Sequence, residues 1–542
     1  MQVTRRGLAA GAAIGGGLLV AWFLLPRSFP NPMVATKGEH VFDAWIKIGE
    51  DSVVTVAVPQ LEMGQGITTL LPQIIAQELG ADWRQIAVAP AAISGAYPNI
   101  ALAERWSALW DPLTDGLSDT TDAILAKQFA QMQRFTATAD GTALAAYEEP
   151  ARLAAASARA MLAKEAGARW GVTWEACEVT QGLVRHGDKQ ATFGELASAA
   201  ADQSPPYPAP IRPKPPAEEV FSSSSGAQAD QPQLAFPRID LPAKVDGSVQ
   251  FAGDVRLPGM VFASIRHGPS DGAELAAFDP DAAADISGLV GVVRGKRWLA
   301  AAAKTWWSAE QALSAMAPKF SVSYPVDSDA INARLDTLLE GGDSFPIAET
   351  GFGAQGLSRV DFARRYEVEP HQAAPLETAS ASARYSAGRL ELWIASQAPE
   401  QARRAAAKAI GLRTEDVVLY PMPAGGSFDA RLEHDHAIEI ALIARELERP
   451  VQLTWPRRDE IIGARPRPSA HILIGAQLAQ PQSGSAGNID ALRVRIACAP
   501  AALEFGQRLF ANRTSWAAIR ETSGRKDPIA CEGAVPPYRL PS

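Results

Sequence analysis

Strand-like segments run through short turns into helix-like segments at several places in this chain, and this recurrence most constrains its fold. Residues 53–58 are rich in β-branched side chains, and leucine and isoleucine then recur at helical spacing up to Gly80. The turn between them contains Gly64 and Gly66, which let a ligand approach the main chain closely. Because the first N–H groups of a helix lack helical partners, we expect this turn to attract an anion.

Three further turns repeat the arrangement. One contains Gln397 and leads into a helix that starts at Pro399. Another is the glycine-rich turn at residues 425–428, and the last lies at residues 136–141, before an alanine-rich helix predicted to start near Pro150. Each turn alone is most simply structural. Together they predict several loops that converge on one large, anionic, polar ligand.

The composition bounds the architecture and the partners. With 542 residues, 47% of them hydrophobic, the chain is long enough for three or four domains. A proline- and serine-rich stretch at residues 204–233 is predicted to be a linker, and clustered glycines between about 325 and 360 mark a second boundary. The net charge of -9 gives no long-range attraction to nucleic acid or anionic lipid, so no nucleic-acid partner is expected.

The N-terminus carries a targeting pattern. Arg5 and Arg6 precede an apolar run from Ala9 to Leu25, which is the order of a twin-arginine signal. The run is marginal for spanning a bilayer, and no small-x-small cleavage site is evident, so a cleaved signal and an uncleaved anchor both remain open, with the anchor slightly favoured. We expect a periplasmic protein, exported already folded, whose N-terminal segment can anchor it to the membrane.

Three cysteines, Cys177, Cys498 and Cys531, form no Cys-x-x-Cys pair. This excludes a self-contained four-thiolate iron–sulfur or zinc site, so any such cluster would lie on another chain.

The motifs match those of one known family. Glu62 to Thr69 reads Glu-Met-Gly-Gln-Gly-Ile-Thr-Thr, Gly425 to Phe428 reads Gly-Gly-Ser-Phe with Arg431 just after it, and Ser396 precedes Gln397. These segments resemble the Met-Gly-Gln-Gly, Gly-Gly-x-Phe and glutamine loops of the large, molybdopterin-binding subunit of the xanthine dehydrogenase/aldehyde oxidase family. Residues 238–260 resemble the entrance to that family's α/β hammerhead domain, and the likeness covers nearly the whole chain.

The order of the motifs narrows the family. The Met-Gly-Gln-Gly element precedes the hammerhead segment, as in the permuted isoquinoline 1-oxidoreductase-like branch. The resemblance implies an α+β, multi-domain molybdopterin-binding architecture. Its expected parts are a twin-arginine signal or membrane anchor (1–30), a permuted molybdopterin-binding segment (31–203), a Pro/Ser-rich linker (204–235), the α/β hammerhead domain (236–325) and a molybdopterin-binding domain incomplete at its C-terminus (360–542).

The resemblance also implies the cofactor and its site. The cofactor would be a molybdopterin carrying molybdenum, as such or as its cytosine dinucleotide, and no side chain is expected to ligate the metal. Glutamine amides and main-chain groups suit it because they donate and accept without adding charge. The predicted cofactor-binding residues are Gly64, Gln65, Gly66, Thr136, Thr138, Gln397, Gly425, Gly426, Ser427, Phe428 and Arg431. For Thr136 and Thr138 a purely structural role is at least equally expected.

The implied reaction is hydroxylation of a carbon beside nitrogen in an N-heteroaromatic compound, or of an aldehyde carbon, with oxygen from water. Electrons would leave through a small subunit with two 2Fe-2S clusters to a cytochrome or membrane acceptor. Such chemistry needs a general base, which in the family is a glutamate in a Gly-Glu-Pro loop. No Gly-Glu-Pro occurs in this sequence, so the catalytic residue stays unknown. Gly194-Glu195 is interpreted as a helix start and Gly49-Glu50 as a hairpin turn.

The end of the chain and one residue of the glycine-rich turn favour an alternative. Residues 533–539 resemble a mid-domain segment of full-length relatives, which indicates a truncated, split or decayed subunit. Asp429 stands where relatives usually have glycine, and a carboxylate beside an anionic cofactor is unfavourable unless paired, with Arg431 as the suggested partner. The alternative to an enzyme subunit is therefore a noncatalytic chain that retains only part of the cofactor-binding scaffold.

Two polar clusters receive plainer interpretations. His434, Asp435 and His436 are predicted to cap a helix, because adjacent positions point in different directions and do not suit one metal ion. The run Arg465-Pro466-Arg467-Pro468 is interpreted as a solvated loop, with binding of an anionic group as the alternative.

Overall fold

The computed structural model of the protein describes residues 29–110, 119–213, 221–222, 233–234, 236–269, 272–341, 344–349, 357–478 and 489–509. The twin-arginine segment before residue 29, most of the predicted linker, Cys531 and the C-terminal segment from residue 510 lie outside these ranges. No helix in the described ranges is long and apolar enough to span a membrane.

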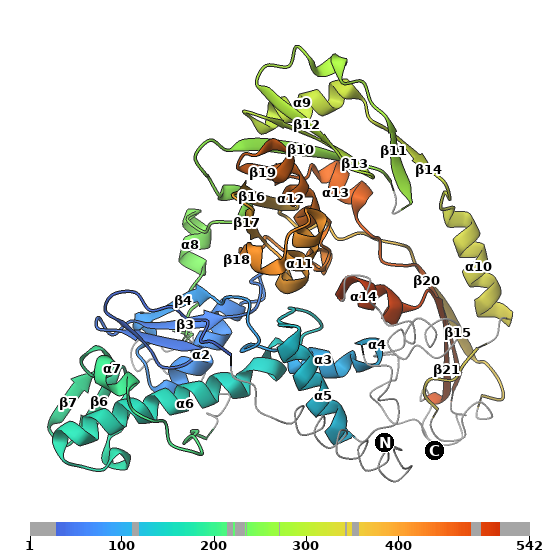
Figure 1. Ribbon diagram of the computed structural model, residues 1–542. Coiled ribbons are helices and arrows are strands. Elements are labelled where there is room, and N and C mark those ends of the chain that lie inside the picture. Colours follow the sequence, from blue (N-terminus) through green and yellow to red (C-terminus); the bar gives the residue numbers. More distant parts are fainter. Residues whose placement is uncertain are drawn as a thin grey trace, which may run out of the picture.

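A four-stranded sheet begins the described chain, in the order β1-β2-β3-β4 (Figure 1). Its strands are β1 (Glu39–Val41), β2 (Ile46–Gly49), β3 (Val54–Val58) and β4 (Ile86–Pro90). Three helices pack against it in one core, namely α2 (Ile67–Leu79), α6 (Ala143–Trp170) and α7 (Phe193–Ala201). A small antiparallel sheet follows α6, with β5 (Glu178–Thr180), β6 (Leu183–His186) and β7 (Lys189–Thr192).

The predicted start of the alanine-rich helix is wrong. Helix α6 begins at Ala143, so Pro150 lies inside it. Tyr147, in the turn before the proline, is 1% exposed and donates a hydrogen bond to the carbonyl of Tyr97 at 3.0 Å. Tertiary packing of this turn therefore outweighs the penalty that proline imposes within a helix, which is about 3 kcal/mol.

A seven-stranded sheet forms the second layer, in the order β12-β13-β10-β19-β16-β17-β18. Its strands are β10 (Val261–His267), β12 (Leu289–Arg294), β13 (Trp298–Ala303), β16 (Ser380–Ser386), β17 (Arg389–Ile394), β18 (Val417–Pro421) and β19 (Val451–Thr454). Because β10 pairs with β19 in parallel, the predicted hammerhead segment and the predicted last domain share one sheet and one core. The domain boundaries themselves stay a prediction.

Helices cover this sheet and extend it. Helices α11 (Pro399–Ala409) and α12 (Asp435–Leu447) pack on the half that contains β16 to β18, and α9 (Trp306–Met316) packs on β10 and β13. Helix α13 (Arg457–Gly463) follows β19, and the short α8 (Leu241–Asp246) lies between the two sheets (Figure 1).

The remaining elements lie at the periphery. A three-stranded antiparallel sheet contains β15 (Phe362–Val368), β20 (Ala470–Leu478) and β21 (Ile489–Cys498), and α10 (Ser328–Gly341) packs on it. Short pairs are formed by β11 (Ala273–Ala277) with β14 (Lys319–Val322) and by β8 (Phe221–Ser222) with β9 (Gln233–Leu234). The helices α3 (Ile100–Arg105), α4 (Ser107–Trp110), α5 (Asp119–Met132) and α14 (Ala501–Leu509) complete the fold.

Several local predictions are confirmed. The strand at residues 53–58 is β3, the following helix α2 ends at Gly80, and α11 begins at Pro399. Glu195 lies in the first turn of α7, where its carboxylate and the Thr192 side chain form a capping box. The turn at Gly49 and Glu50 joins the antiparallel strands β2 and β3. The mixture of helices and sheets confirms the α+β class.

Two helix-ending glycines provide a test of packing. Gly80 and Gly171 both have left-handed backbones, with φ of +80° and +69°. A Cβ on Gly80 would lie 2.5 Å from the carbonyl oxygen of Val179, whereas one on Gly171 would meet nothing within 4 Å. We expect Gly171→Ala to cost about 1 kcal/mol of unfolding free energy, and Gly80→Ala to cost about 2 kcal/mol more. Denaturant melts of both variants check this, and equal losses would contradict it.

Candidate functional site

Four loops meet between the four-stranded and the seven-stranded sheet. Loop 59–66 joins β3 to α2, loop 133–142 joins α5 to α6, loop 395–398 joins β17 to α11, and loop 422–434 joins β18 to α12. Hydrogen bonds connect them in a continuous chain. These bonds are Leu61 N to Thr138 Oγ1 (2.9 Å), Thr138 N to Gln397 O (2.7 Å), Gln397 N to Arg431 O (2.9 Å) and Ala424 N to Glu62 O (2.8 Å). The predicted convergence of the four turns is confirmed, and their role in binding stays a prediction.

Gln397 is the centre of this junction. Its side chain is 0% exposed, and its Nε2 donates to the carbonyl of Thr138 at 2.7 Å and to the carboxylate of Asp429 at 3.1 Å. Its Oε1 accepts from the hydroxyl of Ser427. Both ends of the amide are therefore bound to other loops, so Gln397 orients main chain around the site and does not point a free donor at a ligand.

The two threonines of loop 133–142 are also buried. Thr136 is 3% exposed and its carbonyl accepts from Gln60 Nε2 at 2.9 Å. Thr138 is 5% exposed and its hydroxyl accepts from Leu61 N. Their contacts with loop 59–66 fit the structural alternative for both residues.

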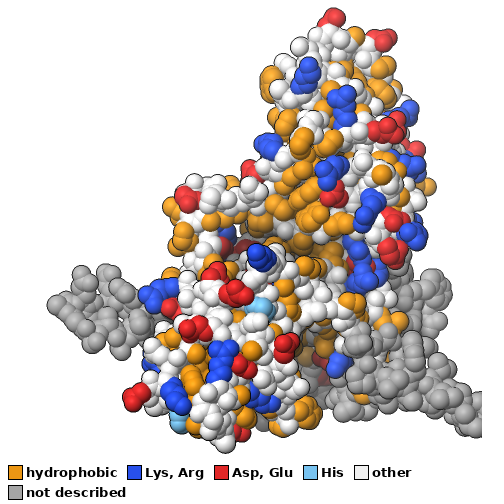
Figure 2. Space-filling model, turned by 60° about the vertical axis from the view of Figure 1, so that its left-hand side comes forward, with side chains coloured by type: hydrophobic (Ala, Val, Ile, Leu, Met, Phe, Trp, Pro, Cys, Tyr) orange, Lys and Arg blue, Asp and Glu red, His pale blue; other side chains and the backbone are white. Residues whose placement is uncertain are grey.

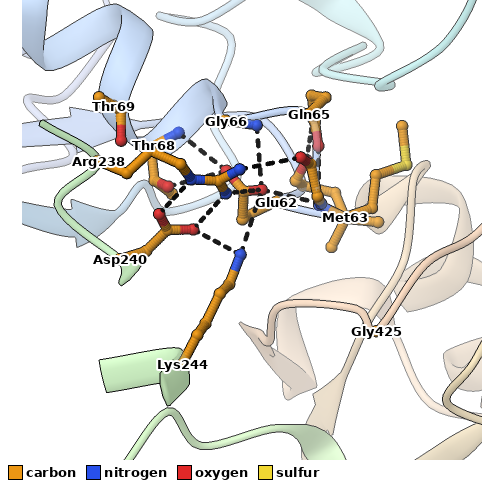
Figure 3. Close-up of polar contacts among 12 residues, drawn as sticks. Glu62, Met63, Gln65, Gly66, Thr68, Thr69, Arg238, Asp240, Lys244 and Gly425 are labelled. Atoms are coloured by element: carbon orange, nitrogen blue, oxygen red, sulfur yellow. Dashed lines mark hydrogen bonds and ion pairs between the residues drawn. The ribbon is translucent and has the colours of Figure 1, made fainter. Parts of the chain in front are cut away.

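The main chain of loop 59–66 folds around the side-chain carboxylate of Glu62, a residue of the same loop, as Figure 3 shows. The N–H groups of Gly64, Gly66 and Thr68 donate to Glu62 at 2.9, 3.2 and 3.1 Å. The expectation that this helix N-terminus would offer these N–H groups to an anion is therefore wrong, because a carboxylate of the same loop already accepts from them.

Gln65 also bonds within the loop. Its Nε2 donates to the carbonyl of Leu61 at 2.6 Å, and its Oε1 accepts from Met63 N at 2.8 Å. Gly64 and Gln65 are nevertheless exposed, and Met63 packs near Ala424 of the neighbouring loop. The outer face of the loop is thus the part that a ligand can reach.

Loop 422–434 contains an unusual backbone. Phe428 and Asp429 have φ of +51° and +67°, and such left-handed conformations cost a residue other than glycine about 1–2 kcal/mol each. The loop is held from behind by Glu377, whose Oε2 accepts from Gly425 N at 2.7 Å. Burial raises the pKa of Glu377. The side chain of Phe428 is 64% exposed at the tip, and strain of this kind is common at ligand sites.

The suggested partner of Asp429 is wrong. Arg431 is 3% exposed and pairs with Glu460 on α13 at 3.2 Å. Asp429 pairs with Arg467 at 3.2 Å, in addition to its bond from Gln397. The two side chains thus have different partners: that of Arg431 lies on helix α13, and that of Asp429 on the segment before β20.

A cleft opens beside this loop. It is lined by Ala373, Ala379, Phe428, Ala430, Arg431, Glu433, Asp435, His436, Trp455, Glu460, Ala464, Arg465, Arg467 and Arg508. The interpretation of Arg465 and Arg467 as a solvated loop is incomplete, because both line the cleft. Arg508 pairs with Glu433 at 3.5 Å, so Arg431, Arg467 and Arg508 each have a carboxylate partner. The cleft is therefore polar without a large excess of charge.

The two histidines beside the cleft are buried. His434 is the N-cap residue of α12 but makes no side-chain capping bond, so the predicted polar cap is wrong for His434. Burial lowers the pKa of His434 to about 4, and burial together with Arg431 lowers that of His436 to about 3. Among the described residues no group of three potential ligands could hold a metal ion.

The comparisons with known proteins agree with these motifs. Residues 341–512 and residues 4–100 each match a model described as a molybdopterin cofactor-binding domain. The chain is 26% identical over 468 residues to the beta subunit of isoquinoline 1-oxidoreductase of Brevundimonas diminuta, which covers 80% of this chain and 56% of that protein.

Two further relatives are similar to the chain. The membrane-bound aldehyde dehydrogenase [pyrroloquinoline-quinone] of Gluconacetobacter polyoxogenes is 23% identical, with 85% of this chain and 56% of that protein covered. A subunit of the nicotinate dehydrogenase of Pseudomonas putida is 24% identical, with 82% and 35% covered. The chain thus spans about half the length of the first two relatives and a smaller share of the third.

The fold and the loops therefore define an α+β protein with molybdopterin cofactor-binding domains. The chain resembles the large, molybdopterin-binding subunits of the xanthine dehydrogenase/aldehyde oxidase family, among them the beta subunit of isoquinoline 1-oxidoreductase.

The buried histidines predict acid lability. A histidine whose folded pKa is below 6.5 stays neutral in the folded protein while the unfolded chain takes up protons, so its contribution is complete above pH 6.5 and is lost as pH falls toward the folded value. For His434, with a pKa of about 4, the loss is up to about 3 kcal/mol. We expect His434→Gln to lose less stability than the native chain between pH 6.5 and 4. Urea melts across this range check it, with the partly exposed His186→Gln as a control that should follow the native curve.

Proposed function

We propose that this chain is the molybdopterin-binding subunit of a molybdenum-dependent hydroxylase that oxidises N-heteroaromatic compounds or aldehydes. The observation that carries the proposal is the convergence of four loops, far apart in sequence, at one junction beside a polar cleft. The names of the relatives, an isoquinoline oxidoreductase, a nicotinate dehydrogenase and an aldehyde dehydrogenase, support the two substrate classes.

The residues at the junction fit a large anionic cofactor. The exposed Gly64 and Gln65, the half-buried Gly425 and Gly426, and the exposed Phe428 offer main chain that a ligand can approach without meeting side chains of the loops. A Cβ on Gly64 would meet nothing within 4 Å, so the space beside it is open. These residues would hold a molybdopterin, with Gln397, Ser427, Thr136 and Thr138 behind them fixing the loops and Arg431 beside the cleft.

A bound molybdenum cofactor supplies a centre that can accept two electrons. In the proposed reaction a C–H bond of the substrate is replaced by C–OH, the oxygen comes from water, and two protons and two electrons leave. The chain's own part is to bind and orient the substrate in the cleft. Because three of the cleft arginines are paired with carboxylates, the cleft suits a neutral, polar substrate such as a heteroaromatic ring, which could stack on Phe428.

We also propose that the electrons pass to a separate small subunit with 2Fe-2S clusters and then to a cytochrome or membrane acceptor. The naming of two relatives as subunits supports a multi-subunit enzyme. The cofactor form, molybdopterin itself or its cytosine dinucleotide, and export by the twin-arginine route with periplasmic or membrane-anchored placement belong to the same proposal.

Metal analysis tests the proposal directly. The full chain, co-expressed with its small subunit, should contain about one molybdenum per chain and should oxidise a quinoline or an aldehyde in the presence of an artificial electron acceptor. Protein that stays free of molybdenum in every combination would favour the alternative, a noncatalytic scaffold.

A matched pair of buried glutamines tests the role of the junction. Gln397→Ala removes the amide that joins three loops, so we expect the molybdopterin content to fall about tenfold or more. Gln452→Ala on β19 removes a comparable amide, which donates to the carbonyls of Gly253 and Val255 away from the loops, and should leave the content unchanged. The bound pterin is quantified by the fluorescence of its oxidised form, and equal losses in both variants would contradict the assignment.

A further inference from the structure

The side-chain carboxylate of Glu62 accepts hydrogen bonds from several donors at once. The residue is 6% exposed, and Oε1 accepts from Gly64 N at 2.9 Å and Gly66 N at 3.2 Å. Oε2 accepts from Thr68 N at 3.1 Å and from the Thr68 hydroxyl at 2.8 Å. The carboxylate therefore replaces solvent for the N–H groups at the start of α2, which otherwise lack helical partners.

Two cationic side chains from a second segment also lie close to the Glu62 carboxylate. Arg238 Nη2 lies 3.4 Å and Lys244 Nζ 3.7 Å from Glu62 Oε1 (Figure 3). Both cations are also held by Asp240, at 2.8 and 2.5 Å. We call residues 238–244 the strap; they lie against loop 59–66 and include the first turn of α8.

The strap also contacts the main chain of the loop. Arg238 Nη1 donates to the carbonyl of Gly64 at 3.2 Å, and Ile239 N donates to the Thr69 hydroxyl at 3.2 Å. A Cβ on Gly66 would lie 4.0 Å from the Arg238 guanidinium, so Gly66 faces the strap without crowding it. The strap therefore contacts loop 59–66 at Glu62 and Gly64 and helix α2 at Thr69.

Glu62 is ionised in this setting. Burial raises the pKa of its carboxyl group, but the hydrogen bonds from Thr68, Gly64 and Gly66 outweigh burial and hold the pKa below its usual value. Each group that hydrogen-bonds to Glu62 is a donor. A glutamine at this position would therefore place its NH₂ group, which can only donate, beside other donors. The site therefore requires a carboxylate and not merely a polar side chain of the same shape.

We propose that Glu62 is a positioning residue that fixes the Met63–Gly66 loop and couples its conformation to the docking of the strap, residues 238–244. The inference rests on the proposed function in one respect, namely that loop 59–66 contacts the cofactor. The coupling itself is a property of the chain without any ligand. The strap lies at the start of the predicted hammerhead domain (236–325), so the coupling joins two parts of the chain that the predicted linker separates in sequence.

Hydrogen exchange of the full chain, read by mass spectrometry on peptides that span residues 59–70, tests the coupling. We expect Glu62→Gln to raise the exchange rates of the Gly64, Gly66 and Thr68 amides about tenfold or more, because each loses a charged acceptor. Glu78→Gln is the matched control. Glu78 is also a buried carboxylate on α2, paired with Arg152 and Arg159 at 3.0 and 2.8 Å, but it lies at the other end of the helix. Its variant should leave these three amides unchanged, and unchanged exchange in Glu62→Gln would overturn the proposal.

Arg238→Met keeps the test decisive if Glu62→Gln does not fold. This variant leaves the bonds within the loop intact and removes the contacts of Arg238 with Glu62 and Gly64, so we expect a smaller rise, about threefold, in the same peptides. Exchange equal to that of the native chain would overturn the coupling to the strap.

Cofactor content separates this inference from the proposed function. If the native chain binds molybdopterin, both variants should bind less, and Glu78→Gln should bind the native amount. If the native chain contains no molybdopterin, the proposed function fails while the exchange result still decides whether Glu62 positions the loop.

Discussion

Every buried main-chain N–H or C=O group needs a hydrogen-bond partner. This requirement determines how the loops pack at the junction between the two sheets. Loops rich in glycine have few side chains with which to fill their own space, so long polar side chains turn inward and bond to the main chain. Glu62 does this for loop 59–66, Gln397 for its two neighbouring loops, and Glu377 for Gly425. What remains at the surface of the junction is mostly glycine main chain and the ring of Phe428.

Because the main-chain groups of these loops are hydrogen-bonded within the protein, the loops are preorganised for binding. A loop whose donors are already bonded keeps its shape before a ligand arrives, and preorganised sites lose less entropy on binding. The side chains of Gln397, Ser427 and Thr138 bond to other loops, so in the proposed function they would shape the surface that the cofactor meets. In the face drawn in Figure 2, acidic and basic side chains are intermixed around a band of hydrophobic ones, and no large patch of one charge sign stands out.

The helices and strands whose signals lie within their own segments are predicted correctly from the sequence. The strand before the first glycine turn and the helices that begin after it and at Pro399 follow from β-branched content, helical periodicity and end signals, all of which lie within the segment itself. The predicted start of α6 is wrong because Tyr147 is buried in the core of the first sheet. This burial stabilises the turn before Pro150 by more than the proline destabilises the helix. The pairing of β10 with β19 also has no local signal, since partners far apart in the chain leave no trace in periodicity.

The order of amino acids alone specifies which turns carry the glycines and amides, how these turns follow one another, and therefore the family. What those groups do depends on how the folded segments pack. Glu62 accepts from the helix N-terminus, Asp429 pairs with Arg467, and Arg431 pairs with Glu460 on another helix. Each of these interactions is a hydrogen bond or ion pair that requires its two atoms to lie about 3 Å apart. Asp429 and Arg467, and Arg431 and Glu460, reach these distances only because separate segments pack together. The bonds of Glu62 lie within one segment, but they require the left-handed turns at Gly64 and Gly66, which the sequence pattern does not specify.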